Sequence, residues 1–408
     1  MNRLVLIGNG FDLAHDLKTS YKDFIIWYLV KCFGNAGYLP ERYQDKLLRI
    51  DFKDFNSFIS AINAHKPGFY HSGYTKEDLI YFITNHFEQK TIKELLNIHA
   101  LISYSDYTFE THYPNNKPFN VLVLSHLLRC LIVNCQDCNW VDIENEYFDQ
   151  LKTCKAKDGS FDKEKIRQLN AEFDYLKQRL KEYLIEQEEQ AKIKVIPELL
   201  SAIGSQFDIS DFEPLMGYDE ARESLGYDKT IVPQIEHNLY FLNFNYTNTV
   251  ENYINELNKK LRFFSKVDIN YIHGELKNAD NPIIFGFGDE HDTVYKEFEE
   301  HRNNELFENI KSYQYLRTPN YRNLLTFLNS KNYQVFVMGH SCGLSDRTML
   351  KTIFEHENCK SIRLFHYNSD FHDKAINVSK HFSNKGHMRK LIVDYKAVDA
   401  FPQSNKEA

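Results

Sequence analysis

Polar side chains that could do chemistry stand at the ends of two apolar segments. The segment LNFNYTNTVE (242–251) contains Asn243, Asn245 and Asn248 and carries no charge before Glu251, and His273 ends the apolar part of YIHGEL. An asparagine side chain donates and accepts hydrogen bonds, so it can orient a sugar hydroxyl or an attacking water. A histidine can act as a general base near neutral pH. Each residue alone also has a structural explanation: a strand-end turn for each asparagine, a core position for the histidine.

The first segment of the chain, MNRLVLIGNGFD, brings two glycines to the end of a short apolar run at residues 3–7. Glycines at residues 8 and 10 let backbone amides approach an anion closely, which suits a nucleotide phosphate. The dinucleotide fingerprint G-x-G-x-x-G is incomplete because its third position is Leu13. A plain turn is therefore the alternative. Asp12 would repel a phosphate, so we expect it to accept from a ribose hydroxyl or to cap local amides.

A third apolar run leads into small polar residues in VFVMGHSCGLSDRTML (335–350). We expect the strand to end at Gly339 and Asp346 to cap a helix that begins at Arg347. The glycines of this turn would again let a ligand approach the backbone. The spacing G-H-S-C-G also comes near the nucleophile elbow G-x-S-x-G, with Ser341 as the nucleophile, which makes a hydrolase an alternative.

An acidic cluster supplies a further candidate site in NWVDIENEYFDQL (139–151). On a helix, Asp142 and Glu146 share a face at the i, i+4 spacing, and Glu144 lies between them. Such carboxylates could form a metal-dependent hydrolase or nuclease site. The alternative is the solvated, acid-rich start of a helix.

Composition places the chain among ordinary globular proteins. Of its 408 residues 42% are hydrophobic and 14% aromatic, which allows a large core. Its 49 basic and 57 acidic residues give a net charge of −8, which argues against a nucleic-acid footprint. The N-terminus lacks a secretory pattern, and no apolar run approaches the roughly 18–20 residues of a membrane span. We expect a soluble, cytoplasmic protein.

The cysteines show no disulfide framework. There are seven, an odd number at irregular spacings, which indicates reduced thiols. Cys135 and Cys138 have the spacing of a zinc knuckle, but no second pair follows, and Cys154 is the only nearby candidate for a third ligand. We therefore expect no metal.

The elements that must position these residues belong to an α/β fold. Short apolar runs end in Asn, Gly, His or Tyr, which is typical of buried parallel strands that carry polar residues at their carboxyl ends. These runs lie at 3–8, 238–246, 268–274, 281–288, 332–340 and 361–367. We predict a mostly parallel, Rossmann-like sheet in a domain of residues 1–30 plus 235–408. Residues 31–234 form a mostly helical insertion, with a polar helical pattern from about 40 to 120.

Two helices have clear sequence signals. One should begin near Thr19 or Ser20, with Asp23 as the capping carboxylate. The other covers about 162–191, where apolar residues recur at alternating spacings of three and four. This seam comprises Ile166, Leu169, Phe173, Leu176, Leu180 and Tyr183. It predicts either a helix hairpin packed within the chain or an arm that forms a homo-oligomer.

Taken together, these motifs resemble the bacterial abortive-infection AbiH family of phage-defence proteins. The resemblance rests on IGNGFDLAHDLKTSYKDF, WVDIENEYF, LNFNYTNTVE, IHGEL and GHSCGLSD, in that order, from residue 5 to about 350. It implies antiphage defence by abortive infection. The family often has glycine after the histidine of the first motif, whereas here Asp16 follows His15.

A more distant resemblance is to sirtuin-like NAD-binding domains, some of which destroy NAD in bacterial immunity. It implies Asn245 and His273 as catalytic residues. The implied cofactor contacts are Gly8, Asn9, Gly10, Phe11, Asp12, Thr247, Gly339, Ser341 and Asp346. Three departures are Asn9 and Asp12 in the first loop and Thr247 where an aspartate is usual. The cysteine pairs of the deacetylases' zinc module are absent, which argues against deacetylation.

The resulting expectation is hydrolysis of NAD at the strand ends, triggered by a phage component and otherwise autoinhibited, since a constantly active enzyme would kill its host. One alternative is a sensor or scaffold that binds a nucleotide or a phage protein without catalysis. The other is the metal-dependent hydrolase or nuclease that uses Asp142, Glu144 and Glu146.

Overall fold

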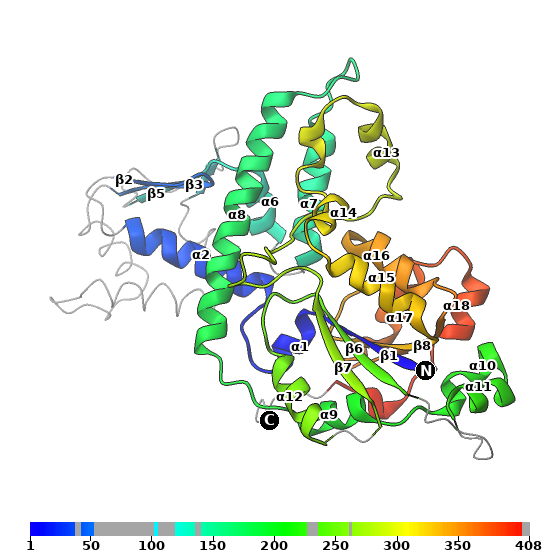
Figure 1. The fold of residues 1–408 in the computed structure, drawn as a ribbon. Helices are drawn as coiled ribbons and strands as arrows, with labels where there is room; N and C mark the ends of the chain where they lie inside the picture. Colours follow the sequence, from blue (N-terminus) through cyan, green and yellow to red (C-terminus); the bar gives the residue numbers. More distant parts are fainter. Residues whose placement is uncertain are drawn as a thin grey trace. The chain divides into compact units, whose positions relative to one another are not determined.

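The computed structural model describes residues 1–36, 42–52, 102–104, 119–134, 140–226, 236–260 and 263–401. The chain forms two compact units, residues 1–19 with 184–408 and residues 20–183 (Figure 1). These boundaries differ from the predicted domains, because residues 184–226 join the unit that holds the N-terminus. In the described residues, no helix has both the length and the apolar character needed to cross a bilayer.

A five-stranded parallel sheet forms the centre of the first unit (Figure 1). Its strands are β1 (Asn2–Ile7), β6 (Asn238–Asn243), β7 (Lys266–Tyr271), β8 (Tyr333–Met338) and β9 (Cys359–Leu364). They lie in the order β7-β6-β1-β8-β9, with every neighbouring pair parallel. The predicted mostly parallel sheet is confirmed, and so are five of its six apolar segments. Because both faces of β1 and β8 are covered, all of their residues are buried, which explains the apolar runs at 4–7 and 335–338.

Helices cover both faces of this sheet and close two separate cores. One core joins Leu4, Leu242 and Val337 to α15 (Asn320–Ser330) and α16 (Arg347–Phe354). The other joins Val5, Phe241 and Met338 to α1 (Asn9–Ala14), α9 (Pro197–Gly204) and α12 (Glu251–Lys260). Alternate residues of each strand point to opposite faces, so each strand contributes to both cores.

The remaining helices of this unit are short. They are η1 (Ile209–Asp211), α10 (Glu213–Met216), α11 (Tyr218–Ser224), α13 (Thr293–Glu300), η2 (Asn304–Phe307), α14 (Lys311–Gln314), η3 (Tyr315–Arg317), η4 (Leu344–Asp346), α17 (Phe371–Ser379), α18 (Lys385–Leu391) and η5 (Ala397–Asp399).

The segment at 281–288 was predicted to be a strand, and this prediction is wrong. Its backbone donors bond to neighbouring loops instead of a strand: the Ile284 amide donates to the His273 carbonyl at 2.7 Å and the Phe287 amide to the Asn309 carbonyl at 3.1 Å. A Cβ added at Gly286 would lie 2.1 Å from the Asn309 oxygen. The glycine therefore permits close packing against this loop. In the sequence, a glycine with this role looks the same as a glycine that ends a strand.

The second unit contains a four-stranded sheet, which corrects the helical prediction for the described part of residues 40 to 120. The strands β2 (Arg42–Gln44), β3 (Leu48–Phe52), β5 (Phe119–Val123) and β4 (Ile102–Tyr104) lie in the order β2-β3-β5-β4. Leu48 pairs with Val123, far along the chain, and such pairing leaves no local periodic signal. Residues 53–101 and 105–118 of this predicted helical stretch lie outside the described residues.

Among the described residues of this unit, the helices are α2 (Tyr21–Ala36), α6 (His126–Asn134), α7 (Trp140–Thr153) and most of α8 (Lys163–Gln190). The predicted cap of α2 is confirmed, because the Asp23 amide donates to Ser20 Oγ at 3.1 Å. The predicted long helix is confirmed as α8, and its seam is buried. Tyr147 of α7 stacks on Phe173 of this seam and donates to Asn170 Oδ1 at 2.6 Å. The chain itself therefore covers the seam, as in the hairpin alternative.

Candidate functional site

Polar loops from four parallel strands meet at the carboxyl edge of the five-stranded sheet. β1 lies between β6 and β8, so the loops after these strands become neighbours. Asn245 Nδ2 donates to the Gly8 carbonyl at 3.0 Å, and Thr247 Oγ1 donates to Asp12 Oδ2 at 2.6 Å. The Gly10 amide donates to the Gly339 carbonyl at 2.9 Å. Open parallel sheets bind ligands outside the carboxyl ends of strands where the strand order reverses, and β1 and β8 lie at such a point.

The glycines of the first loop serve the packing of two loops against each other. A Cβ added at Gly8 would lie 2.5 Å from the Cα of His340, and one at Gly10 would lie 2.9 Å from the Cα of Gly339. The Gly8 amide donates to the Met338 carbonyl at 3.1 Å and the Phe11 amide to the Gly8 carbonyl at 2.8 Å. These amides are occupied by carbonyls of the chain, so a phosphate would have to be held by other groups.

Asp12 is a buried carboxyl group with one oxygen available. Burial raises the pKa of Asp12 to about 6, although the neighbouring side chains of Thr247, Thr249 and Asn245 oppose this shift. Its Oδ1 is buried and has no hydrogen-bond partner in the described part of the chain. A buried acceptor without a donor is costly, and a ligand hydroxyl would remove that cost.

The free energy of unfolding of Asp12→Asn, relative to that of the wild type, should increase as the pH rises. The pKa of Asp12 is about 6 in the folded chain and about 3.9 in the unfolded chain, so its favourable contribution is present below about pH 4 and lost as pH rises through 6. The difference between Asp12→Asn and wild type should therefore change by up to roughly 3 kcal/mol between pH 4 and pH 8. Urea unfolding at both pH values measures it, and a difference independent of pH would contradict the prediction.

Four buried side chains beside these loops form what we call the histidine–aspartate cluster: His273, Lys311, His340 and Asp346. Lys311 Nζ lies 2.7 Å from Asp346 Oδ1, and His273 Nε2 lies 3.3 Å from the same oxygen. His340 Nε2 lies 3.6 Å from Asp346 Oδ2. Each of the four side chains is at most 7% exposed. A single carboxylate thus organises three basic groups away from water.

The cluster holds two neutral histidines beside an ion pair. Burial opposes the ionisation of Asp346, but Lys311 and the two histidines outweigh it and hold the pKa of Asp346 well below its usual range. Burial, with Lys311 also contributing, lowers the pKa of His273. Burial lowers the pKa of His340 to about 4. The Cys342 amide donates to His340 Nδ1 at 3.0 Å, so the ring proton of neutral His340 lies on Nε2, toward Asp346.

His273 is covered on its reactive side. The hydroxyl of Tyr315, in η3, lies 3.0 Å from His273 Nε2, and the two rings stack. The histidine ring also hydrogen bonds to the backbone carbonyl of Phe244 and to the Asp346 carboxylate, whose Oδ1 lies 3.3 Å from Nε2. A substrate could reach this nitrogen only after Tyr315 has moved.

Comparison with known proteins decides the family. Residues 4–368 match the family described as bacteriophage abortive infection AbiH, which is nearly the whole chain. The chain belongs to the AbiH family. No curated protein matches it. The AbiH match begins within β1 and continues past β9, so it includes every strand of the parallel sheet. Membership assigns the chain to phage defence by abortive infection, as the sequence motifs predicted.

The late glycine-rich turn of this AbiH chain does not have the form of a nucleophile elbow. The strained position with positive φ is Cys342, at 53°, whereas the predicted nucleophile Ser341 is exposed. Burial raises the pKa of Cys342 to about 12, so this thiol stays protonated and unreactive. The predicted cap is also corrected: Asp346 directly precedes α16, but its side chain makes no cap hydrogen bond and instead pairs with Lys311.

Of the predicted acidic trio on α7, Glu144 and Glu146 are described, and they differ in burial. Glu144 is buried, whereas Glu146 is partly exposed and accepts from Gln150 Nε2 at 2.9 Å. The side chain of Asp142 lies outside the part of the chain that the structure describes, as do Cys135 and Cys138. Cys154 is buried, and its thiol donates to the Gln150 carbonyl at 3.5 Å.

Three residues of the AbiH site were absent from the predicted set: Lys311, Tyr315 and His340. His340 follows an apolar strand and a glycine, so the strand-end pattern that identified His273 could have identified it. Lys311 and Tyr315 lie in short helices of a polar segment after β7. No local pattern marks these two residues as buried.

Proposed function

We propose that this AbiH chain acts in abortive infection by binding NAD at the carboxyl edge of the parallel sheet and hydrolysing its N-glycosidic bond. In this proposal the first unit is a Rossmann-like domain of the sirtuin-like type. Numbered by their order along the chain, its strands lie as 3-2-1-4-5, which is part of the doubly wound dinucleotide-binding order. The observation that carries the proposal is the meeting of Asn245, Asp12 and the histidine–aspartate cluster at this edge.

The proposed reaction needs one base and one orienting group. Water attacks C1′ of the nicotinamide ribose, the bond from C1′ to the nicotinamide nitrogen breaks, and neutral nicotinamide leaves. The proton of the water passes to Nε2 of His273, which is neutral because its pKa is lowered. Asn245 is held in place by Gly8 and orients the ribose or the water, while Asp12 Oδ1 accepts from a ribose hydroxyl.

The covered state of His273 fits a defence enzyme that must stay silent before infection. Tyr315 occupies the nitrogen that would take the proton. We propose that a phage component stabilises a conformation in which η3 has moved away, because a ligand shifts an equilibrium toward the state that it binds more tightly.

The proposal predicts that His273→Ala abolishes NAD loss during infection. General base catalysis typically supplies roughly 10²–10⁴ in rate, so turnover should fall by about that factor. Cellular NAD is measured over the course of phage infection, together with cell survival. His237→Ala is the matched control, because His237 is also buried but bonds to the Met1 carbonyl at the opposite edge of the sheet.

Other outcomes separate the alternatives. NAD loss that continues in His273→Ala would contradict the mechanism. Full defence in His273→Ala with NAD bound by the purified protein but never consumed would favour a nucleotide sensor or scaffold. Defence that depends on a chelatable metal and on Asp142, Glu144 and Glu146 would favour the hydrolase or nuclease alternative.

A further inference from the structure

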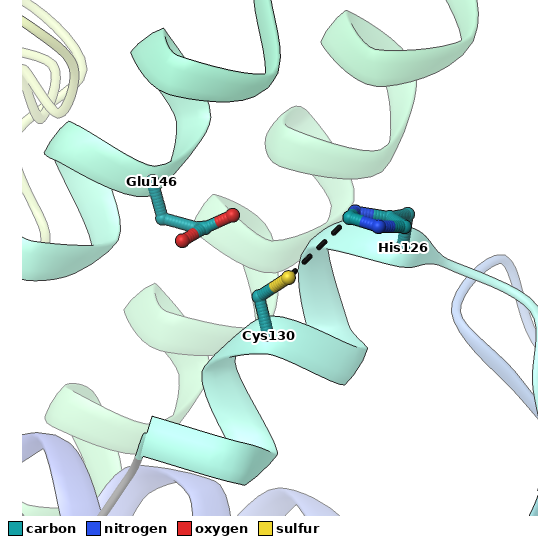
Figure 2. A group of neighbouring side chains, drawn as sticks. All are labelled: His126, Cys130 and Glu146. Carbon is teal, nitrogen blue, oxygen red and sulfur yellow. Dashed lines mark hydrogen bonds between the residues drawn. The ribbon is translucent and has the colours of Figure 1, made fainter. Parts of the chain in front are cut away.

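Three side chains of the second unit with metal-binding atoms lie together on two helices. His126 and Cys130 belong to α6 and Glu146 to α7, and their ligand atoms all lie within 4.8 Å of one another. Figure 2 shows the imidazole, the thiol and the carboxylate directed toward the same space between the helices. His126 Nδ1 lies 3.7 Å from Cys130 Sγ.

The helix start explains why the first two residues share a face. The Leu128 amide donates to Ser125 Oγ at 3.1 Å, so Ser125 caps α6 and fixes its first turn. Ser125 Oγ also donates to Glu172 Oε2 of α8 at 2.6 Å, which anchors this helix end. His126 and Cys130 are then one turn apart, at the i, i+4 spacing that places two ligands on one side of a helix.

The spacing of the ligand atoms suits zinc. Tetrahedral zinc with a bond of about 2.3 Å to sulfur and about 2.0–2.1 Å to nitrogen separates the two ligands by about 3.5 Å. The observed 3.7 Å is close to this value. The Glu146 carboxylate, on the neighbouring helix, has an oxygen within 4.8 Å of both other ligand atoms. Histidine, thiolate and carboxylate together are the ligand set of a borderline-soft divalent cation.

The electrostatics of the cluster also favour a cation. A Cys130 thiolate and the Glu146 carboxylate would both be negative, and their ligand atoms lie within 4.8 Å of each other. A divalent ion between them would compensate both charges. Gln150 Nε2 donates to Glu146 Oε1 at 2.9 Å and holds the carboxylate in position, as outer residues commonly do at metal sites.

We propose that His126, Cys130 and Glu146 bind one zinc ion, with the fourth position open to water. The ion would join α6 to α7 within the second unit. Three protein ligands and an exchangeable fourth are the arrangement of zinc sites that activate water. The proposal is independent of NAD chemistry, because it uses no residue of the parallel sheet.

The test is direct zinc binding by the full-length chain. Isothermal titration calorimetry with Zn²⁺ should give one site per chain, weakened at least tenfold in His126→Ala, Cys130→Ser and Glu146→Gln. Loss of an outer residue alone typically costs about 10–100-fold in affinity. The matched controls are Asp149→Asn, an exposed acid on the same helix, and Cys154→Ser, a buried thiol nearby. Both should bind as tightly as the wild type.

Cobalt gives a second readout that does not depend on affinity. Co²⁺ bound through a thiolate shows a charge-transfer absorption, which should disappear in Cys130→Ser and remain in Cys154→Ser. Zn²⁺ should raise the melting temperature of the wild type but not of the ligand variants, whose metal-free melting temperatures confirm their folding. Retention of the cobalt band in Cys130→Ser, or its loss only in Cys135→Ser/Cys138→Ser, would overturn the proposal.

Discussion

Replacing Lys311 with methionine is expected to destabilise the chain by about 3–5 kcal/mol at neutral pH, because it leaves a buried carboxylate without its cation. Lys311 is 1% exposed and its Nζ lies 2.7 Å from Asp346 Oδ1. Methionine retains much of the aliphatic packing of lysine, so the loss reports the missing charge. The pKa of Asp346, held well below its usual range chiefly by Lys311 against burial, would rise in the variant.

The double variant Lys311→Met/Asp346→Asn separates a broken ion pair from a general packing defect. Removing both charges leaves no uncompensated ion, so the double variant should recover more than half of the loss. Calorimetric unfolding of the wild type, both single variants and the double variant completes the cycle. Equal losses in Lys311→Met and the double variant would show that the pair makes no electrostatic contribution.

The pH dependence of the stability loss in Lys311→Met tests the role of this ion pair independently. In the wild type, burial and then Lys311 lower the pKa of His273. Without Lys311, His273 can take up a proton more easily and pair with Asp346 Oδ1, which lies 3.3 Å away. The Lys311→Met variant should therefore lose less stability near pH 5 than near pH 8.

The parallel sheet could be predicted from the sequence because its signals are local. β1 and β8 are buried on both faces, which favours apolar runs such as those at 4–7 and 335–338. Polar residues that follow strands of the sheet, such as His273 after β7, mark its carboxyl edge. The Ser20 cap and the α8 seam are local for the same reason, since a helix makes its contacts within one or two turns.

The parts that could not be predicted depend on contacts between distant segments. The sheet of the second unit joins Leu48 to Val123, and neither run alone differs from a buried helix segment. Lys311 is buried only because Asp346 compensates its charge, and the sequence does not show that the two meet. The proposed zinc cluster likewise forms only because α6 and α7 are adjacent. The sequence therefore does not show that Cys130 and Glu146 lie close together.

Replacing Gly339 with alanine is expected to be among the most destabilising single changes in the chain. Gly339 has φ of +74°, a conformation that costs an L-residue about 1–2 kcal/mol. The added methyl would also lie 2.2 Å from the Phe11 amide nitrogen, which is backbone and cannot turn aside. The loops after β1 and β8 would have to separate, so we expect a loss above about 4 kcal/mol, a size seen only for severe defects.

Gly217→Ala is the matched control, because it isolates conformational strain from crowding. Gly217 lies in the same unit. Its φ of +78° and ψ of 159° form a combination that only glycine adopts readily. A Cβ added at Gly217 would nevertheless meet no atom within 4 Å. Its strain should cost about 1–3 kcal/mol. Denaturant unfolding of both variants should show the larger loss at Gly339. Equal losses would mean that the loops after β1 and β8 can move apart at little cost in free energy. The carboxyl edge of the parallel sheet, where we place the nucleotide, would then be deformable and not fixed by its glycines.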